Sequence, residues 1–198
     1  MESNFFAMMS RLKYIDRWAL MRNTRQENLC EHSLDVAMIA HALAVISNVR
    51  CGNSLNADKA AVIGMYHDAS EIITGDLPTP IKYYSDDMKA AFKEIEKVAD
   101  YKIINMLPDD IKKEYESVFF KRENDEYLWK LVKAADKIAA YIKCIEEENT
   151  GNSEFKSAKK TVLSAINEID LEEVRIFMEE FIPAYGKNLD ELNKPKRG

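Results

Sequence analysis

Histidines are scarce in this chain, so each of the three can be weighed as a metal ligand or a catalytic group. His32 and His41 are nine residues apart, and at about 100° per residue they point to opposite sides of one helix. They cannot share one metal ion, and we interpret His41 as a helix-surface or core histidine. His67 is followed by Asp68 and, one helical turn later, by Glu71. These three side chains are therefore expected around one end of a helix.

A carboxylate far along the chain completes a possible metal site. Asp136 lies among the alanines of residues 133–140, whose small side chains leave space for an ion. With His32, His67 and Asp68 it makes a mixed nitrogen and oxygen set, which suits a transition-metal dication better than calcium or magnesium. Cobalt, manganese, copper, zinc and iron all stay open. Four protein ligands on a six-coordinate ion leave positions for water and a substrate oxygen, as metal-assisted hydrolysis requires.

Each member of this set also has a structural interpretation. A single histidine near a helix end is more often a cap or a packing residue than a ligand. Asp136 is equally well explained, from spacing alone, by an ion pair with Lys133 or Lys137 on a solvated face. The case for a metal site depends on the four residues occurring together.

The elements that must position these residues are all predicted to be helices. Helical periodicity recurs along the chain, strand-like alternation is absent, and glycine and proline are few. In the first long helix the apolar residues Leu34, Met38, Ala42, Val45 and Ile46 recur at helical spacing. The predicted helices cover residues 31–48, 57–72, 88–106, 109–119, 124–148, 154–169 and 171–181. The sequence therefore predicts an all-α fold, a compact helical bundle, with one domain over 1–192 and a disordered tail over 193–198.

Composition and charge narrow the classes of protein and partner. Hydrophobic residues make up 46% and charged residues 31% of the 198 residues, which is typical of a globular domain. The balance of 28 basic against 34 acidic residues gives a net charge of −6, so we expect no nucleic-acid polymer as partner. We expect three reduced thiols, because the cysteines are odd in number and widely spaced. No signal-peptide pattern opens the chain and no apolar run approaches the roughly 20 residues of a membrane span, so we expect a cytoplasmic protein without a membrane segment.

The order His32, His67-Asp68 and Asp136 resembles that of the HD-domain superfamily of metal-dependent phosphohydrolases. Nearly the whole chain is similar to the bacterial 5′-deoxynucleotidases of that superfamily. Beyond the four ligands, the similarity is carried by residues 5–7, 10–13, 17–18, 20–23, 31–33, 65–71, 74–80 and 133–136. One departure is Cys30 before Glu31, where a small hydroxylated or aliphatic residue is expected. It puts nothing catalytic in doubt.

The resemblance implies roles for residues that spacing alone does not single out. Arg17 is expected to grip the phosphate with forked hydrogen bonds and to offset its charge, and Trp18 to wall the sugar or the base. Either Glu71 or Asp76 is expected to transfer a proton, and the sequence does not decide between them. The residues expected to bind substrate are Arg17, Trp18, His32, Asp68, Asp76, Leu77, Pro78, Thr79 and Asp136.

The reaction that the resemblance implies is hydrolysis of a deoxyribonucleoside 5′-monophosphate to the deoxynucleoside and phosphate, with selection against ribonucleotides. It also implies a homodimer. Three alternatives stay open: an HD-type enzyme acting on another nucleotide phosphate ester, a nucleotide-sensing module without turnover, and a helical interaction domain in which the histidines are structural.

Overall fold

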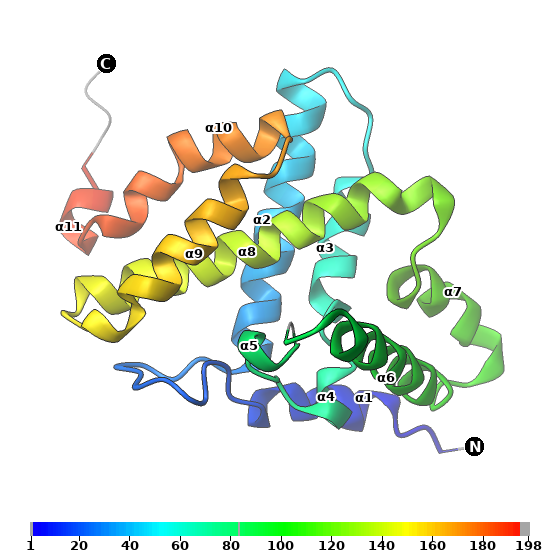
Figure 1. The fold of residues 1–198 in the computed structure, drawn as a ribbon. Helices are drawn as coiled ribbons and strands as arrows, with labels where there is room; N and C mark the ends of the chain where they lie inside the picture. The colour runs from blue at the N-terminus through cyan, green and yellow to red at the C-terminus, as the bar shows by residue number, and fades with distance from the viewer. Residues whose placement is uncertain (1, 83, 195–198) are drawn as a thin grey trace.

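The computed structural model describes residues 2–82 and 84–194 of the chain. Within these residues the regular structure is helical, and the one β-type contact is an isolated antiparallel bridge between Asp16 and Asn28 (Figure 1). The predicted all-α fold is confirmed. In chain order the elements are α1 (Phe5–Met9), the 3-10 helix η1 (Ser10–Tyr14), α2 (Leu29–Arg50), α3 (Ala57–Tyr66), α4 (Glu71–Thr74), α5 (Thr79–Lys82), α6 (Asp86–Ile104), α7 (Asp109–Phe119), η2 (Glu123–Asp125), α8 (Glu126–Asn149), η3 (Ser153–Phe155), α9 (Lys156–Asn167), α10 (Glu172–Glu180), η4 (Ile182–Gly186) and α11 (Leu189–Leu192).

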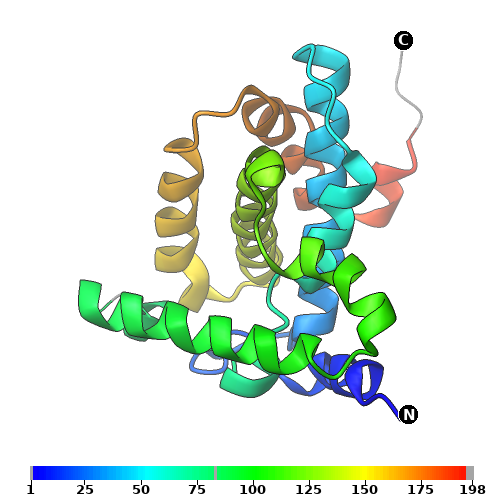
Figure 2. The ribbon, with the colours of Figure 1, turned by 90° about the vertical axis from the view of Figure 1, so that its right-hand side faces the viewer.

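Two long helices, α2 and α8, form the centre of the fold. The helix α2 packs against α3, α8 and α10, while α8 also contacts α3 and α9. Figure 2 views α8 nearly end-on, with α9 on one side and α2 on the other. Leu43 of α2, Ile63 of α3 and Leu131 and Ile138 of α8 are fully buried between these helices. Burial of such aliphatic side chains is the main favourable contribution to folding.

The start of α2 is fixed by its cap. The Asn28 side chain accepts hydrogen bonds from the backbone N–H of Cys30 (2.9 Å) and Glu31 (3.1 Å), and Glu31 Oε2 accepts one from the Asn28 N–H (3.3 Å). This reciprocal capping box satisfies donors that the first turn would otherwise leave free. It places His32 in the first turn of the helix, facing the protein interior with no exposed surface.

A close approach brings α3 against α2. A Cβ atom at Gly64 would lie 2.8 Å from the Ala37 Cα and 3.0 Å from the Ala37 nitrogen. Only glycine fits there without moving one of the two helices. The contact holds the end of α3 beside the start of α2, which sets His67 near His32.

The helix α3 is shorter than the sequence predicts. We expected it to continue to residue 72, whereas it ends at Tyr66, and Asp68 lies in the turn before α4. The cause is local: His67 Nδ1 lies 2.8 Å from the Gly64 carbonyl oxygen, the acceptor that the Asp68 N–H would use in a continuous helix. Tighter backbone bonds, from Ala69 to Tyr66 and from Glu71 to Asp68, replace the helical ones.

The apolar residues of α2 are divided between buried and exposed faces. Of those that recur at helical spacing, Leu34, Met38 and Val45 are 54%, 55% and 39% exposed, whereas Ile46 is buried together with Val36, Ile39 and Leu43. Periodicity could not choose between the faces because α2 is apolar on several sides. It is long and apolar enough to cross a membrane by composition, yet 56% of its most apolar window is buried inside the fold. We interpret it as a core helix.

The end of the described chain bears on the predicted tail. Of the residues 193–198 that we expected to be disordered, Asn193 and Lys194 follow α11 directly, and 195–198 lie outside the described residues.

Candidate active site

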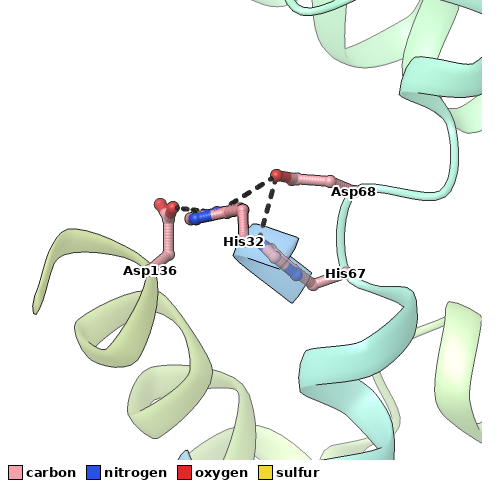
Figure 3. Close-up of side chains that lie close together, drawn as sticks. All are labelled: His32, His67, Asp68 and Asp136. Carbon is pink, nitrogen blue, oxygen red and sulfur yellow. Dashed lines mark ion pairs between the residues drawn. The ribbon is translucent and has the colours of Figure 1, made fainter. Parts of the chain in front are cut away.

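Four side chains from three parts of the fold meet at one point (Figure 3). His32 comes from the first turn of α2, His67 and Asp68 from the turn after α3, and Asp136 from the middle of α8. His67 Nε2 lies 3.1 Å from Asp68 Oδ2, and His32 Nε2 lies 3.1 Å from Asp136 Oδ1 and 3.7 Å from Asp68 Oδ2. One ligand atom from each residue lies within 4.8 Å of all the others.

This cluster has the composition and spacing of a metal site. The Nε2 atoms of His32 and His67 are buried and, although a carboxylate oxygen lies 3.1 Å from each, neither makes a well-aligned hydrogen bond in the described structure. A bound ion would satisfy both atoms. Two ligand atoms at about 2.1 Å from one ion and at right angles lie about 3 Å apart, close to the spacing seen here. His67 Nδ1 is oriented by the Gly64 carbonyl, so its Nε2 is the atom left for an ion. The residues therefore fit a divalent transition-metal cation.

The two imidazoles differ in protonation. Burial and the charge of Arg17 lower the pKa of His32 to about 4, so this ring is neutral at pH 7. Burial alone would lower the pKa of His67, but the adjacent Asp68 carboxylate raises it to about 9. In the metal-free protein His67 and Asp68 are thus an ion pair, and burial does not prevent His67 from holding the pKa of Asp68 well below its usual range.

Arg17 lies beside the cluster. Its Nη1 is 3.6 Å from Asp68 Oδ2 and its Nε is 3.4 Å from Glu27 Oε2, and only 11% of its side chain is exposed. Burial would lower the pKa of Arg17, but the carboxylates of Asp136 and Asp68 raise it. The guanidinium is a fixed positive charge at the edge of the cluster.

Trp18 follows in an unusual backbone conformation. Its φ is +57°, the one positive φ of a non-glycine residue in the described chain. The indole Nε1 donates to Glu27 Oε2 (3.1 Å), and the indole lies 5.3 Å from the ring of buried Phe155. Such a strained residue persists only where its surroundings hold it.

A cavity of about 520 Å³, which we call the α9 pocket, opens next to Arg17 and Trp18. The predicted substrate residues Asp76, Leu77 and Pro78 line it. The side chain of Thr79, also predicted to bind substrate, lies outside the described part of the structure. The opposite wall is formed by α9, through Ser157, Ala158, Thr161 and Val162.

The two candidate proton-transfer residues occupy different surroundings. Glu71 is only 2% exposed, and its Oε1 accepts a hydrogen bond from Lys82 Nζ (2.6 Å) while its Oε2 has no partner among the described residues. Burial and the nearby Asp68 raise the pKa of Glu71 to about 8, although Lys82 opposes the shift. Asp76 is half-buried, and burial raises its pKa against the opposing charges of Arg17 and Lys82.

A second cavity, of about 500 Å³, reaches the cluster from the side of α6; His67, Asp68, Lys82, Glu96 and Asp136 are among its lining residues. Three of the four cluster residues line this second cavity, whereas Arg17 and Trp18 line the α9 pocket. The second cavity therefore opens onto the cluster itself, whereas the α9 pocket opens beside Arg17.

Several residues of the site could not be found from sequence. Glu27 and Lys82 had no motif to mark them, and the α9 residues are small side chains on an ordinary amphipathic helix. His41, by contrast, is exposed and 3.8 Å from Asp58 Oδ1, away from the cluster, as the helical spacing predicted.

Comparisons with known proteins agree with this geometry. Residues 4–185 match the family model described as 5′-deoxynucleotidase YfbR-like. A 5′-deoxynucleotidase of Erwinia tasmaniensis is 46% identical over 97% of this chain and 97% of its own. Among solved structures, an HD-domain phosphohydrolase from Listeria innocua gives a TM-score of 0.80 at 23% identity, covering 92% of this chain and 88% of its own. A cyanophage S-2L HD phosphohydrolase bound to dA and one catalytic zinc ion gives 0.63 at 18% identity, covering 92% and 96%.

Proposed function

This chain belongs to the YfbR-like 5′-deoxynucleotidase family and is a phosphoric monoester hydrolase, and we propose that His32, His67, Asp68 and Asp136 form its metal site. The reaction is hydrolysis of deoxyribonucleoside 5′-monophosphates to deoxynucleoside and phosphate. The observation that carries the proposed site is the meeting of four ligand atoms beside a buried arginine and an open pocket. When bound, a divalent cation there supplies a Lewis acid that polarises the phosphate and lowers the pKa of water.

Arg17 orients the phosphate in this proposal. Its planar guanidinium donates parallel hydrogen bonds to two phosphate oxygens and offsets the charge that develops as the ester bond breaks. Its position 3.6 Å from Asp68 keeps the phosphate next to the metal ligands. The nucleoside then extends into the α9 pocket, between Trp18 and the segment of Asp76, Leu77 and Pro78.

Glu71 is our choice for the proton-transfer residue. Its buried carboxyl has one oxygen without a partner, and a pKa raised to about 8 lets it exchange a proton near neutral pH. Asp76 lines the nucleoside pocket beside Arg17, which favours a role in binding.

Three finer features belong to the same proposal: a transition metal, a cytoplasmic location and a homodimer of one-domain chains (residues 1–192). The nitrogen and oxygen ligand set favours cobalt, manganese, copper, zinc or iron. The relative with a catalytic zinc ion supports this class of metal. Exposed apolar side chains along one side of α2, Leu34, Met38, Val45 and Val49, support association with a second copy.

A matched pair of substrates tests the function. Phosphate release is measured from a deoxyribonucleoside 5′-monophosphate and its ribonucleotide, with each metal added in turn, for the wild type, Arg17→Ala and Trp18→Ala. An unpaired hydroxyl buried against Trp18 costs about 1–3 kcal/mol, which is roughly ten- to a hundredfold discrimination.

We expect Arg17→Ala to depress both substrates together and Trp18→Ala to narrow the deoxy-to-ribo ratio of kcat/KM. If Trp18→Ala keeps the wild-type deoxy-to-ribo ratio of kcat/KM, the selectivity for deoxyribonucleotides is assigned instead to the segment from Asp76 to Thr79. No turnover of either nucleotide with any metal would contradict the proposed function.

A further inference from the structure

The loop that carries Arg17 and Trp18 is closed at its base by backbone pairing. The Arg17 N–H donates to the Glu27 carbonyl (2.9 Å), and the Leu29 N–H donates to the Ile15 carbonyl (2.9 Å). Because the two arms are paired, the position of the returning arm, residues 22–27, determines that of the outgoing arm. We call residues 16–28 the recognition loop.

A buried ion pair on α8 holds the returning arm. Lys143 and Glu147 lie one turn apart with side chains 5% and 1% exposed, and their Nζ and Oε1 atoms are 2.5 Å apart. Glu147 Oε2 accepts hydrogen bonds from the Thr24 N–H (2.9 Å) and the Thr24 hydroxyl (2.7 Å). The Arg25 N–H donates to Glu147 Oε1 (3.3 Å), and Lys143 Nζ donates to the Arg25 carbonyl (2.5 Å). Both charged groups of the pair thus form hydrogen bonds with the backbone of the loop.

A third group ties the same carboxylate to the loop. Asn152 Nδ2 donates to Glu147 Oε2 (2.7 Å) and to the Arg22 carbonyl (2.6 Å). Burial alone would raise the pKa of Glu147, but the hydrogen bonds from Lys143, Thr24 and Asn152 hold it well below its usual range. The carboxylate is therefore charged and fully bonded in the folded protein, as a buried charge must be.

The anchored arm is connected to strained Trp18. Asn23, beside Thr24, donates through Nδ2 to the Trp18 carbonyl (3.1 Å), and Glu27 bonds the indole. The positive φ of Trp18 requires such support, because a side chain at this φ has lower-energy conformations available. If residues 22–25 were released, the backbone of Trp18 would be free to relax.

The metal site and the anchor share one rigid element. Asp136 and Glu147 are eleven residues apart on α8, three helical turns, so they lie on nearly the same side of that helix. A helix is stiffer than a loop, and sites held by such elements are more precise.

We propose that the Lys143–Glu147 pair is a positioning device that holds Arg17 and Trp18 in register with the metal ligands. This inference rests on the proposed function of those two residues. Neither member of the pair lines the α9 pocket. They act through the recognition loop, and their removal should weaken substrate recognition while leaving the metal site intact.

A second ion pair, between α3 and the residue that precedes α8, provides a matched control. Lys59 Nζ donates to Asp125 Oδ2 (2.6 Å) just before α8 begins, and Asp125 is 6% exposed. Among the described residues, the hydrogen bond and ion pair of the Asp125 side chain go to Lys59 and not to the recognition loop. Asp125→Asn therefore removes a comparable buried charge without releasing residues 22–25.

The experiment compares Glu147→Gln, Thr24→Val and Asp125→Asn with the wild type. Thr24→Val removes one hydrogen bond to Glu147 and leaves the ion pair in place, so it serves if Glu147→Gln fails to fold. Limited digestion with trypsin reports on the loop directly, because Arg22 and Arg25 have side chains 90% and 75% exposed. Metal content and kcat/KM for a matched deoxyribonucleotide and ribonucleotide are measured on the same preparations.

For Glu147→Gln we expect faster cleavage after Arg22 and Arg25 and wild-type metal content. We also expect a fall in kcat/KM of about 10- to 100-fold through a higher KM, since a misplacement of about 1 Å costs up to roughly 10²-fold. The deoxy-to-ribo ratio of kcat/KM should also be lower in Glu147→Gln than in the wild type. Thr24→Val should change in the same direction by less, and Asp125→Asn should keep the wild-type cleavage rate and ratio.

Wild-type cleavage and kinetics in both loop variants would overturn the proposal, and so would equal changes in Asp125→Asn. The trypsin result does not depend on turnover. If the wild type hydrolyses no nucleotide, the proposed function fails while the digestion still decides whether the pair anchors the loop.

Discussion

At the scale of single residues, the four side chains of the cluster differ in protonation state. His32 is neutral because it is buried beside Arg17, and His67 is protonated because Asp68 is beside it. Although partial burial opposes the shift, the hydrogen bond and charge of His32 lower the pKa of Asp136, so this carboxyl group is ionised. The metal-free site therefore holds one exchangeable proton on its ligands, on His67.

This arrangement predicts that metal binding releases a proton. A histidine binds a metal ion only through a deprotonated ring nitrogen. At any pH below about 9, an incoming ion therefore displaces the proton from His67 Nε2. We expect release of about one proton per ion at pH 7, and an affinity that rises about tenfold per pH unit and levels off near pH 9. Calorimetric titration in buffers of different ionisation enthalpy measures this. The titration is made with the Glu71→Gln variant, so that a proton released by Glu71 does not add to the number measured for His67. No proton release would contradict the His67–Asp68 ion pair.

Glu71 should affect turnover more than metal binding. We expect Glu71→Gln to lower kcat by roughly 10²-fold or more, because proton transfer is worth about that much, while metal content stays unchanged. Asp76→Asn is the matched comparison, and it should raise KM more than it lowers kcat because Asp76 lines the α9 pocket. Steady-state kinetics of the two variants across pH decide the roles. A larger loss of kcat in Asp76→Asn would assign proton transfer to Asp76.

At the scale of elements, the site depends on how closely α3 approaches α2. Gly64→Ala places a methyl group 2.8 Å from the Ala37 backbone, so the helices must separate. Overpacking of this kind costs about 1–3 kcal/mol of the free energy of unfolding. We expect weaker metal binding as well, because His67 moves away from His32. Chemical denaturation and metal titration measure both effects. Gly186→Ala, where an added Cβ meets nothing within 4 Å, is the control, and equal losses in both variants would contradict this account.

The sequence predicted the helices far better than it predicted where they end. The all-α class and the long helices follow from periodicity, and the four candidate ligands follow from residue type together with family resemblance. The end of α3 was missed because it depends on the side chain of His67 competing for the Gly64 carbonyl. Periodicity also cannot find Glu147, which in a linear reading is one acid in the run 146–148. Its contacts to Thr24 arise from residues over a hundred positions apart.

At the scale of the whole molecule, the exposed side of α2 is the surface that we assign to the homodimer. Leu34, Met38 and Val45 recur at helical spacing, and Val49 continues the same side with 76% exposure. A substitution that places a charge in the middle of this strip should oppose association.

We therefore expect Met38→Glu to convert a dimer to a monomer with little change in the unfolding midpoint. Light scattering coupled to size-exclusion chromatography gives the mass of each species. Val98→Glu, at a 66% exposed apolar residue on α6, is the control and should leave the dimer intact. A monomeric wild type, or an unchanged dimer in Met38→Glu, would reject this surface.

We propose that four residues hold one metal ion, and Asp68 is the residue to replace first because it contacts both histidines of the cluster. The measurement is metal content by mass spectrometry together with phosphate release from a deoxyribonucleoside 5′-monophosphate, in Asp68→Ala and in the exposed-site control Asp170→Ala. We predict that Asp68→Ala loses both the bound metal and the activity, while Asp170→Ala keeps both. Full metal content with wild-type turnover in Asp68→Ala would contradict the assignment of the site.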